Sequence, residues 1–224
     1  MTRKTPTRPY HHGDLKRALL EASLELIRAE GVDALTVAEV GRRVGVSSAA
    51  PYKHFADRQA LLRALAEEGN RRLGEALVAA TRGSTDPHEA FRLSGVAYIR
   101  WAAENPALYR IATDPAHIDY ASTEHDVDAP EALKGSMETF WPELGALVSS
   151  GVALTASHPL VQQLRGRALA QGVASLFVSG VFASLGITTA DAERIARAVT
   201  GEDVPATSRR RAPPASQSPQ VSKR

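Results

Sequence analysis

The sequence contains no cysteine. This absence excludes disulfides, thiolate metal sites and a cysteine nucleophile, so the chain cannot be a disulfide-stabilised secreted module. It also fits the reducing cytoplasm, where we expect the protein to act. A secretory signal is not indicated, because the basic residues at the N-terminus lead into no apolar run.

The sequence also lacks the patterns of common catalytic and metal sites. It contains no nucleophile elbow, no phosphate-binding glycine loop and no closely spaced carboxylates on one helix face. Its seven histidines are scattered, without the paired helical spacing of a metal site. A solvated acidic loop is favoured over a metal site for the stretch that holds His117, Asp119, His125 and Asp126. We therefore expect no enzyme, no metal and no cofactor, and a helical-bundle enzyme is the least favoured alternative.

No charged residue occurs from Ala168 to Ala190. A run of this length is long enough to cross a bilayer. Glutamine, serine, threonine and glycine residues interrupt it, however, and small residues also suit close packing between helices. We therefore favour a buried helix at an oligomer interface over a membrane span.

The charges that are present are unevenly distributed, although the formal net charge is only +2. Residues 1–63 carry 11 Lys and Arg against 7 Asp and Glu, residues 64–200 carry 11 against 16, and residues 201–224 carry 5 against 2. A basic first segment on an acidic body suits a polyanionic partner at one end, because phosphates attract local Lys and Arg rather than overall charge.

Apolar residues recur at helical spacing through most of the chain, and no stretch alternates convincingly enough for a strand. The first helix is expected over residues 14–30, with Gly31 as its stop. A capping box at residues 36–39 predicts the start of the second helix, and Asp57 is expected to cap the fourth. Further helices are expected over residues 48–55, 88–105, 106–113, 131–150 with a kink near Pro142, 160–185 and 190–199.

This pattern predicts an all-α fold in which an N-terminal three-helix, helix-turn-helix domain precedes a C-terminal helical bundle. We expect a flexible basic arm over residues 1–9, the helix-turn-helix over 10–60 and the bundle over 61–200, with a long loop at 114–130. The tail over 201–224 is rich in Pro, Ser and Arg, so it cannot bury enough apolar area to order itself.

The second and third short helices are joined by a tight turn at Gly45, an arrangement that lets a helix enter the major groove of DNA. Val44, Val46 and Phe55 are assigned to the core. The side chains that the third helix then leaves exposed include hydrogen-bonding groups, a cation and a methyl group, but no carboxylate. A helix that faces phosphates tends to exclude carboxylates. The exposed set is Ser47, Ser48, Ala49, Tyr52, Lys53 and His54.

The run TVAEVGRRVGVS at residues 36–47, followed by YKHF at 52–55 and by Asp57 and Arg58, closely resembles the tetracycline-repressor (TetR) family of bacterial regulators. YHHGDL at residues 10–15 resembles one branch of that family. Pro51 departs from the bulkier aliphatic residue common at its position. The resemblance implies phosphate contacts from Thr36, Tyr52 and His54, contacts to base edges or nearby phosphates from Ser47, Ser48, Ala49 and Lys53, and a supporting role for Arg58.

The resemblance also implies a homodimer that binds double-stranded operator DNA and is released by an unknown small-molecule effector. The alternative is a DNA-binding regulator or architectural protein without such a ligand. By analogy, the last two helices would form the dimer interface with Leu169, Val173, Leu176, Ile195 and Val199. An apolar effector would contact aromatic residues of the acidic body, each of which is also a candidate for plain core: Tyr98, Trp101, Tyr109, Phe140, Trp141 and Phe177.

Overall fold

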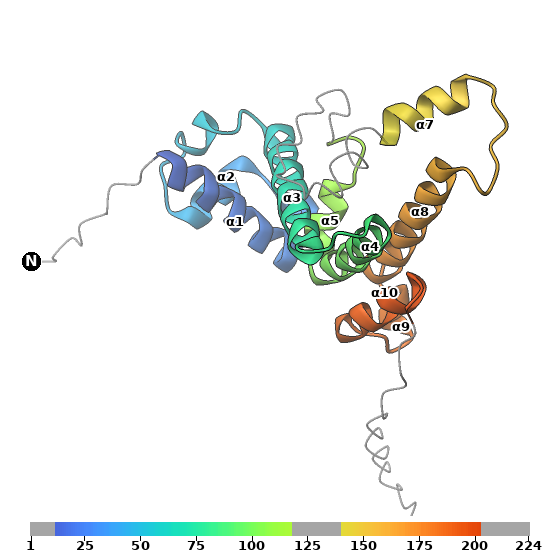
Figure 1. The fold of residues 1–224 in the computed structure, drawn as a ribbon. Helices are drawn as coiled ribbons and strands as arrows, with labels where there is room; N and C mark the ends of the chain where they lie inside the picture. The colour runs from blue at the N-terminus through green and yellow to red at the C-terminus, as the bar shows by residue number, and fades with distance from the viewer. Residues whose placement is uncertain (1–11, 118–139, 203–224) are drawn as a thin grey trace, which may run out of the picture.

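The computed structural model of the protein describes residues 12–117 and 140–202, and these residues form helices and turns without a β-strand (Figure 1). The expected basic arm, the start of the YHHGDL motif and nearly all of the expected tail lie outside the described residues. Most of the acidic loop, with Asp119, His125 and Asp126, also lies outside them.

The N-terminal part begins with α1 (His12–Glu30), which starts earlier than predicted and ends where predicted. Gly31 follows with a φ of 87°, the left-handed conformation expected of a helix stop. A short 3₁₀ turn, η1 (Val32–Ala34), leads to α2 (Val37–Val44). The amide of Glu39 donates to the Thr36 hydroxyl oxygen at 3.1 Å, so Thr36 caps α2 as predicted.

The long helix α3 (Arg58–Thr81) lies between the N-terminal helices and the body of the molecule (Figure 1). It starts where the sequence predicted, because the Asp57 carboxylate accepts a hydrogen bond of 2.7 Å from the amide of Ala60. The domain boundary expected after residue 60 therefore falls inside a continuous helix.

The body consists of α4 (Pro87–Glu104), α5 (Pro106–Ala112), α7 (Phe140–Ser149), α8 (Pro159–Val178), α9 (Val181–Ser184), η3 (Thr189–Asp191) and α10 (Ala192–Val199). Helix α4 is central, since α3, α8 and α10 all pack against it. Helix α7 reaches away from the other helices, beyond the start of α8 (Figure 1). It is the described part of the helix expected over residues 131–150, and it contains Pro142.

The prediction of one continuous helix over residues 160–185 is wrong at its C-terminal end. Helix α8 stops at Val178, and Gly180 adopts a φ of 84° before the single turn of α9. The uncharged run is thus divided between two helices. Within the described residues, no helix has both the length and the apolar character that a bilayer span requires.

One hydrophobic core extends from the helix-turn-helix into the body. It joins Leu24 of α1 and Phe55 to Trp101 of α4, Tyr109 of α5 and Val178 of α8. A smaller cluster lies between α4, α8 and α10, with Ile99, Val173 and Ala196 at its centre. Because the core is shared and close-packed, a shift of α4, α5 or α8 would also displace the helices that hold the N-terminal motif.

Candidate DNA-binding surface and effector cavity

Residues 47–54, here named the recognition segment, follow α2 after a left-handed Gly45 with a φ of 76°. The prediction of a regular helix over residues 48–55 is only partly right. The segment forms a turn and then a 3₁₀ helix, η2 (Pro51–Lys53). Pro51 has no amide hydrogen to donate to the Ser47 carbonyl, which accepts instead from the amide of Ala50 at 3.0 Å.

Two side chains hold the recognition segment against the protein. Pro51 and Phe55 are buried, whereas Tyr52 and Lys53 between them point outward, with 49% of Tyr52 exposed. Ser47, Ser48 and Ala49 are also exposed, and His54 is half-buried with its ring 6.4 Å from that of Phe55. Five of the six residues predicted to be exposed are therefore exposed, and His54 is only partly so.

Two predicted DNA contacts from outside the segment also have roles within the chain. Thr36 is exposed and caps α2. Arg58 is exposed, but its guanidinium donates to the backbone carbonyls of Leu35 at 3.0 Å and Val32 at 2.9 Å. These bonds tie the start of α3 to the connection between η1 and α2. Arg58 therefore stabilises the segment that carries Thr36.

Glu39, the one acidic residue of α2, is paired with two arginines. Glu39 accepts hydrogen bonds from Arg42 at 2.7 and 2.8 Å and from Arg43 at 3.0 Å, rather than completing the predicted capping box. These bonds, with that from Arg42 the largest cause, lower the pKa of Glu39 to about 2. Arg43 also pairs with Glu30, which ties α2 to the end of α1.

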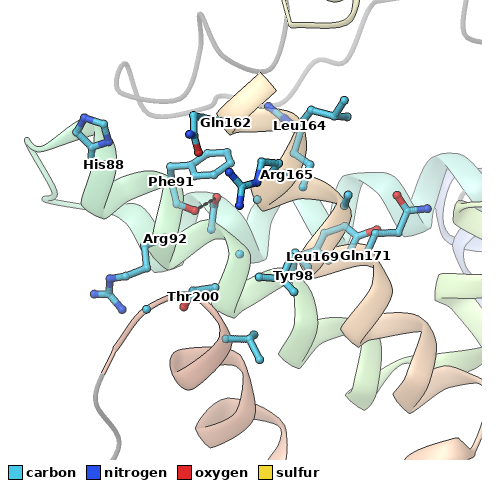
Figure 2. A pocket seen from close by; sticks show the side chains of 18 of the residues that line it. His88, Phe91, Arg92, Tyr98, Gln162, Leu164, Arg165, Leu169, Gln171 and Thr200 are labelled. Atoms are coloured by element: carbon cyan, nitrogen blue, oxygen red, sulfur yellow. Dashed lines mark hydrogen bonds between the residues drawn. The ribbon is translucent and has the colours of Figure 1, made fainter. Parts of the chain in front are cut away.

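A second feature is a cavity of about 1040 Å³ between α4 and α8, closed at one end by residues that follow α10. Figure 2 shows Phe91 of α4 near Gln162 and Arg165 of α8, and Tyr98 near Leu169, whereas the Arg92 side chain points away from α8. His88 and Thr200 also line the cavity. Gly166 lets the two helices approach, because a Cβ at this position would lie 2.5 Å from the Phe91 ring. The size is at the upper end of small-molecule cavities.

Of the aromatic residues predicted to contact an effector, Tyr98 and Trp141 line this cavity. Trp101 and Tyr109 lie in the main core, and the Tyr98 hydroxyl donates to that of Tyr109 at 3.2 Å. Burial is the largest cause of the raised pKa of both tyrosines. Phe177 packs beside the smaller cluster, and Phe140 is buried under the guanidinium of Arg167, 4.5 Å from its ring centroid.

The predicted interface residues separate into two groups. Leu169 and Leu176 are exposed on α8. Val173 belongs to the smaller cluster within the chain, and Ile195 and Val199 of α10 pack against it. The structure thus leaves Leu169 and Leu176 on the surface, while the other three also serve the chain's own core.

Two family models cover most of the described chain. Residues 19–65 match the bacterial regulatory proteins of the tetR family, and residues 91–201 match the tetracyclin repressor-like C-terminal domain. The chain belongs to the TetR family of bacterial transcriptional regulators. The helix-turn-helix and the all-α fold expected from the sequence are therefore confirmed. The branch suggested by residues 10–15 stays a prediction.

Individual proteins are also similar to this chain. A protein of unknown function from Rhodococcus sp. RHA1 is 31% identical, with a TM-score of 0.60 over 87% of this chain and 97% of that one. The fatty acid degradation regulator FadR from Bacillus halodurans shares the fold alone, at 16% identity and a TM-score of 0.53 over 87% of this chain and 97% of its own. The HTH-type transcriptional regulator BetI from Rhizobium meliloti (strain 1021) is 29% identical over 112 residues, which are 50% of this chain and about half, 54%, of the relative.

Sequence reasoning missed the polar residues of the cavity in this TetR-family chain. His88, Arg92, Arg165 and Arg167 line it, and none was a candidate. One signal was present in the sequence: Arg165 and Arg167 flank Gly166 on an otherwise uncharged helix. Their convergence with α4 depends on helix packing, which residue spacing alone does not give.

Proposed function

We propose that this TetR-family regulator is a homodimeric repressor that binds a near-palindromic operator through its two recognition segments and is released by a small-molecule effector. The observation that carries the proposal is the exposed, carboxylate-free set of Ser47, Ser48, Ala49, Tyr52 and Lys53, together with the exposed Thr36 that caps α2. Hydroxyl and amino groups are suited to phosphates and base edges.

Dimerisation would supply the second recognition segment. Leu169 and Leu176 are 45% and 39% exposed on α8, and Leu185 after α9 is 69% exposed. Exposed apolar residues gathered on neighbouring elements are typical of a protein interface. A two-fold axis through this surface would present the two segments to major-groove faces about one helical turn, roughly 34 Å, apart.

The cavity between α4 and α8 supports the release step. A ligand there contacts two helices that share a core with the helix-turn-helix. The ligand would bind more tightly to a dimer whose two recognition segments are wrongly spaced for the operator. The difference between its binding free energies for the two dimer conformations is the free energy that lowers operator affinity.

A mobility-shift titration tests the proposal with the full chain and the intergenic DNA beside its own gene. We expect binding to this DNA to be at least about 10³-fold tighter than to random DNA of the same length. Repeating the titration with candidate metabolites tests release. Equal affinity for both DNAs at several salt concentrations would overturn site-specific regulation.

A further inference from the structure

The recognition segment lacks the side chains that read bases through paired hydrogen bonds. Residues 47–54 contain no Arg, Asn, Gln, Asp or Glu. Arginine pairs with guanine in this way, asparagine and glutamine pair with adenine, and carboxylates accept from cytosine. Lys53 can contact either guanine or a phosphate, and the serine hydroxyls both donate and accept, so these groups discriminate little between base edges. The segment therefore needs another source of specificity.

The arginines nearest to the segment in sequence already have partners within the chain. Arg42 and Arg43 of α2 both donate to Glu39. The Arg58 guanidinium donates to two backbone carbonyls at the connection between η1 and α2. Turning any of these groups toward a base edge would break those bonds, and the broken bonds would offset part of the gain from a new contact.

Ala49 lies on the outward face of the segment. Helical turns continue through this part of the chain, since the amide of Ala50 donates to the Ser47 carbonyl at 3.0 Å and η2 follows directly. Residues three or four positions apart share a face of such a segment. Ala49 precedes Tyr52 by three positions and Lys53 by four, and all three side chains are exposed. A methyl group therefore lies between two larger exposed side chains.

The opposite face of the segment fixes where this methyl group stands. Pro51 and Phe55 are buried, and Pro51 packs against Gly41 of α2. The pyrrolidine ring of Pro51 also fixes its φ, which limits the conformations of the segment. An apolar contact depends on close approach, because a small gap already forfeits much of the dispersion energy. A rigid segment with a small side chain at its surface can make such a contact at a defined position.

Thymine is the base that matches an exposed methyl group. In the major groove it alone presents a methyl group, at C5, and alanine forms an apolar contact with it. We propose that Ala49 is a specificity-determining residue whose methyl group contacts the C5-methyl group of one thymine in each operator half-site. The proposal deepens the proposed function and rests on its site-specific DNA binding. It implies a thymine at one fixed position in each half-site.

Replacing thymine by deoxyuridine tests the contact, because it removes the C5-methyl group and leaves base pairing unchanged. The full-length protein first selects its preferred duplex from a random-sequence library. Each thymine of one half-site and its symmetry mate are then replaced in turn, and mobility-shift titration gives the affinities. We expect a position at which replacement in both half-sites weakens binding about fifteenfold, or about fourfold per half-site, as burial of one methyl group provides. A selected half-site without thymine, or an unchanged affinity at every thymine, would overturn the proposal.

Two matched glycine substitutions assign the contact to Ala49. Ala49→Gly removes the exposed methyl group, so this variant should bind the thymine and deoxyuridine duplexes with nearly equal affinity. Ala50→Gly places the same flexible residue in the same turn, but Ala50 is half-buried, so this variant should keep the preference for thymine. Circular dichroism checks that both variants fold. An Ala49→Gly variant that keeps the full preference would contradict the assignment.

The selection step separates this proposal from the proposed function. If the library yields a preferred duplex whose affinity depends on no thymine methyl group, site-specific binding stands and the role of Ala49 fails. If the library yields no preferred duplex, site-specific binding itself fails. Neither result depends on the small-molecule effector, because the titrations contain protein and DNA alone.

Discussion

Gly41 of α2 and Pro51 of η2 approach so closely that a Cβ on Gly41 would lie 2.3 Å from the Pro51 Cγ. Both residues are buried. Because real Cβ atoms do not come this near to another side chain, this contact needs glycine at position 41. The pair sets the distance between α2 and the recognition segment, which in turn determines how far Tyr52 and Lys53 stand out from the protein.

Gly41→Ala should therefore destabilise the fold by up to about 2 kcal/mol. Overpacking costs about 1–3 kcal/mol, and the better helix propensity of alanine offsets about 1 kcal/mol of it. Adding Pro51→Ala should restore much of the loss, since alanine has no Cγ. Urea denaturation of the two single variants and the double variant measures this coupling. Gly145→Ala on α7, where an added Cβ meets nothing within 4 Å, is the control and should be neutral or stabilising. Strictly additive effects would contradict the contact.

Tyr52→Ala should weaken operator binding at least tenfold, or by about 1.4 kcal/mol or more, while the fold is retained, because about half of the side chain is exposed. Mobility-shift titration gives the affinity, and circular dichroism checks the fold. Trp141→Ala, another exposed aromatic residue distant in sequence from the recognition segment, should leave operator affinity unchanged in the absence of ligand. Normal operator binding by the Tyr52 variant would count against the assigned surface.

Lys53→Ala should lower operator affinity and also the dependence of that affinity on salt. Each phosphate contact adds roughly one to the slope of log affinity against log salt concentration, so a dimer that loses two should lose about two. Titrations at four or more salt concentrations measure the slope. Arg82→Ala, an exposed cation just after α3, should not change it. An unaltered slope in the Lys53 variant would exclude the phosphate contact.

Leu169→Glu combined with Leu176→Glu should convert the dimer to a monomer, because both exposed side chains would place charge in an apolar interface. Sedimentation velocity reports the change in mass, and operator affinity should fall with it. Leu154→Glu, which alters an even more exposed leucine between α7 and α8, should remain dimeric. A stable dimer in the double variant would show that Leu169 and Leu176 do not lie in the dimer interface.

The Glu39 network should give a defined pH dependence. In the folded protein the pKa of Glu39 is about 2, below its ordinary value of 4.5, so the hydrogen bonds with Arg42 and Arg43 stabilise the fold above pH 4.5. That contribution is lost as the pH falls from about 4.5 to about 2. The difference in Tm between wild type and Glu39→Gln should therefore be greatest at neutral pH and shrink across this range. A difference that is constant from pH 7 to pH 2 would contradict the role assigned to the network.

The sequence predicted the elements whose ends have local chemical causes. Thr36 and Asp57 cap α2 and α3 with their own side chains, and Gly31 and Gly45 adopt left-handed conformations after α1 and α2. The exposed recognition set followed from the same logic, since assigning Phe55 to the core left Tyr52 and Lys53 outside. The break at Gly180 also had a local signal, the glycine itself, which the length of the uncharged run obscured.

The sequence by itself thus determined the all-α class, the helix-turn-helix and which residues of the proposed DNA-binding segment are exposed, because caps, turns and helical periodicity act over a few neighbouring residues. Only the tertiary structure decided which apolar residues became core and which stayed on the surface. Val173 and Leu176 are both apolar and lie one turn apart on α8, yet α4 and α10 cover the first and not the second. The convergence of Arg165 and Arg167 with Phe91 likewise depends on how α8 packs against α4, a long-range contact that residue spacing does not encode.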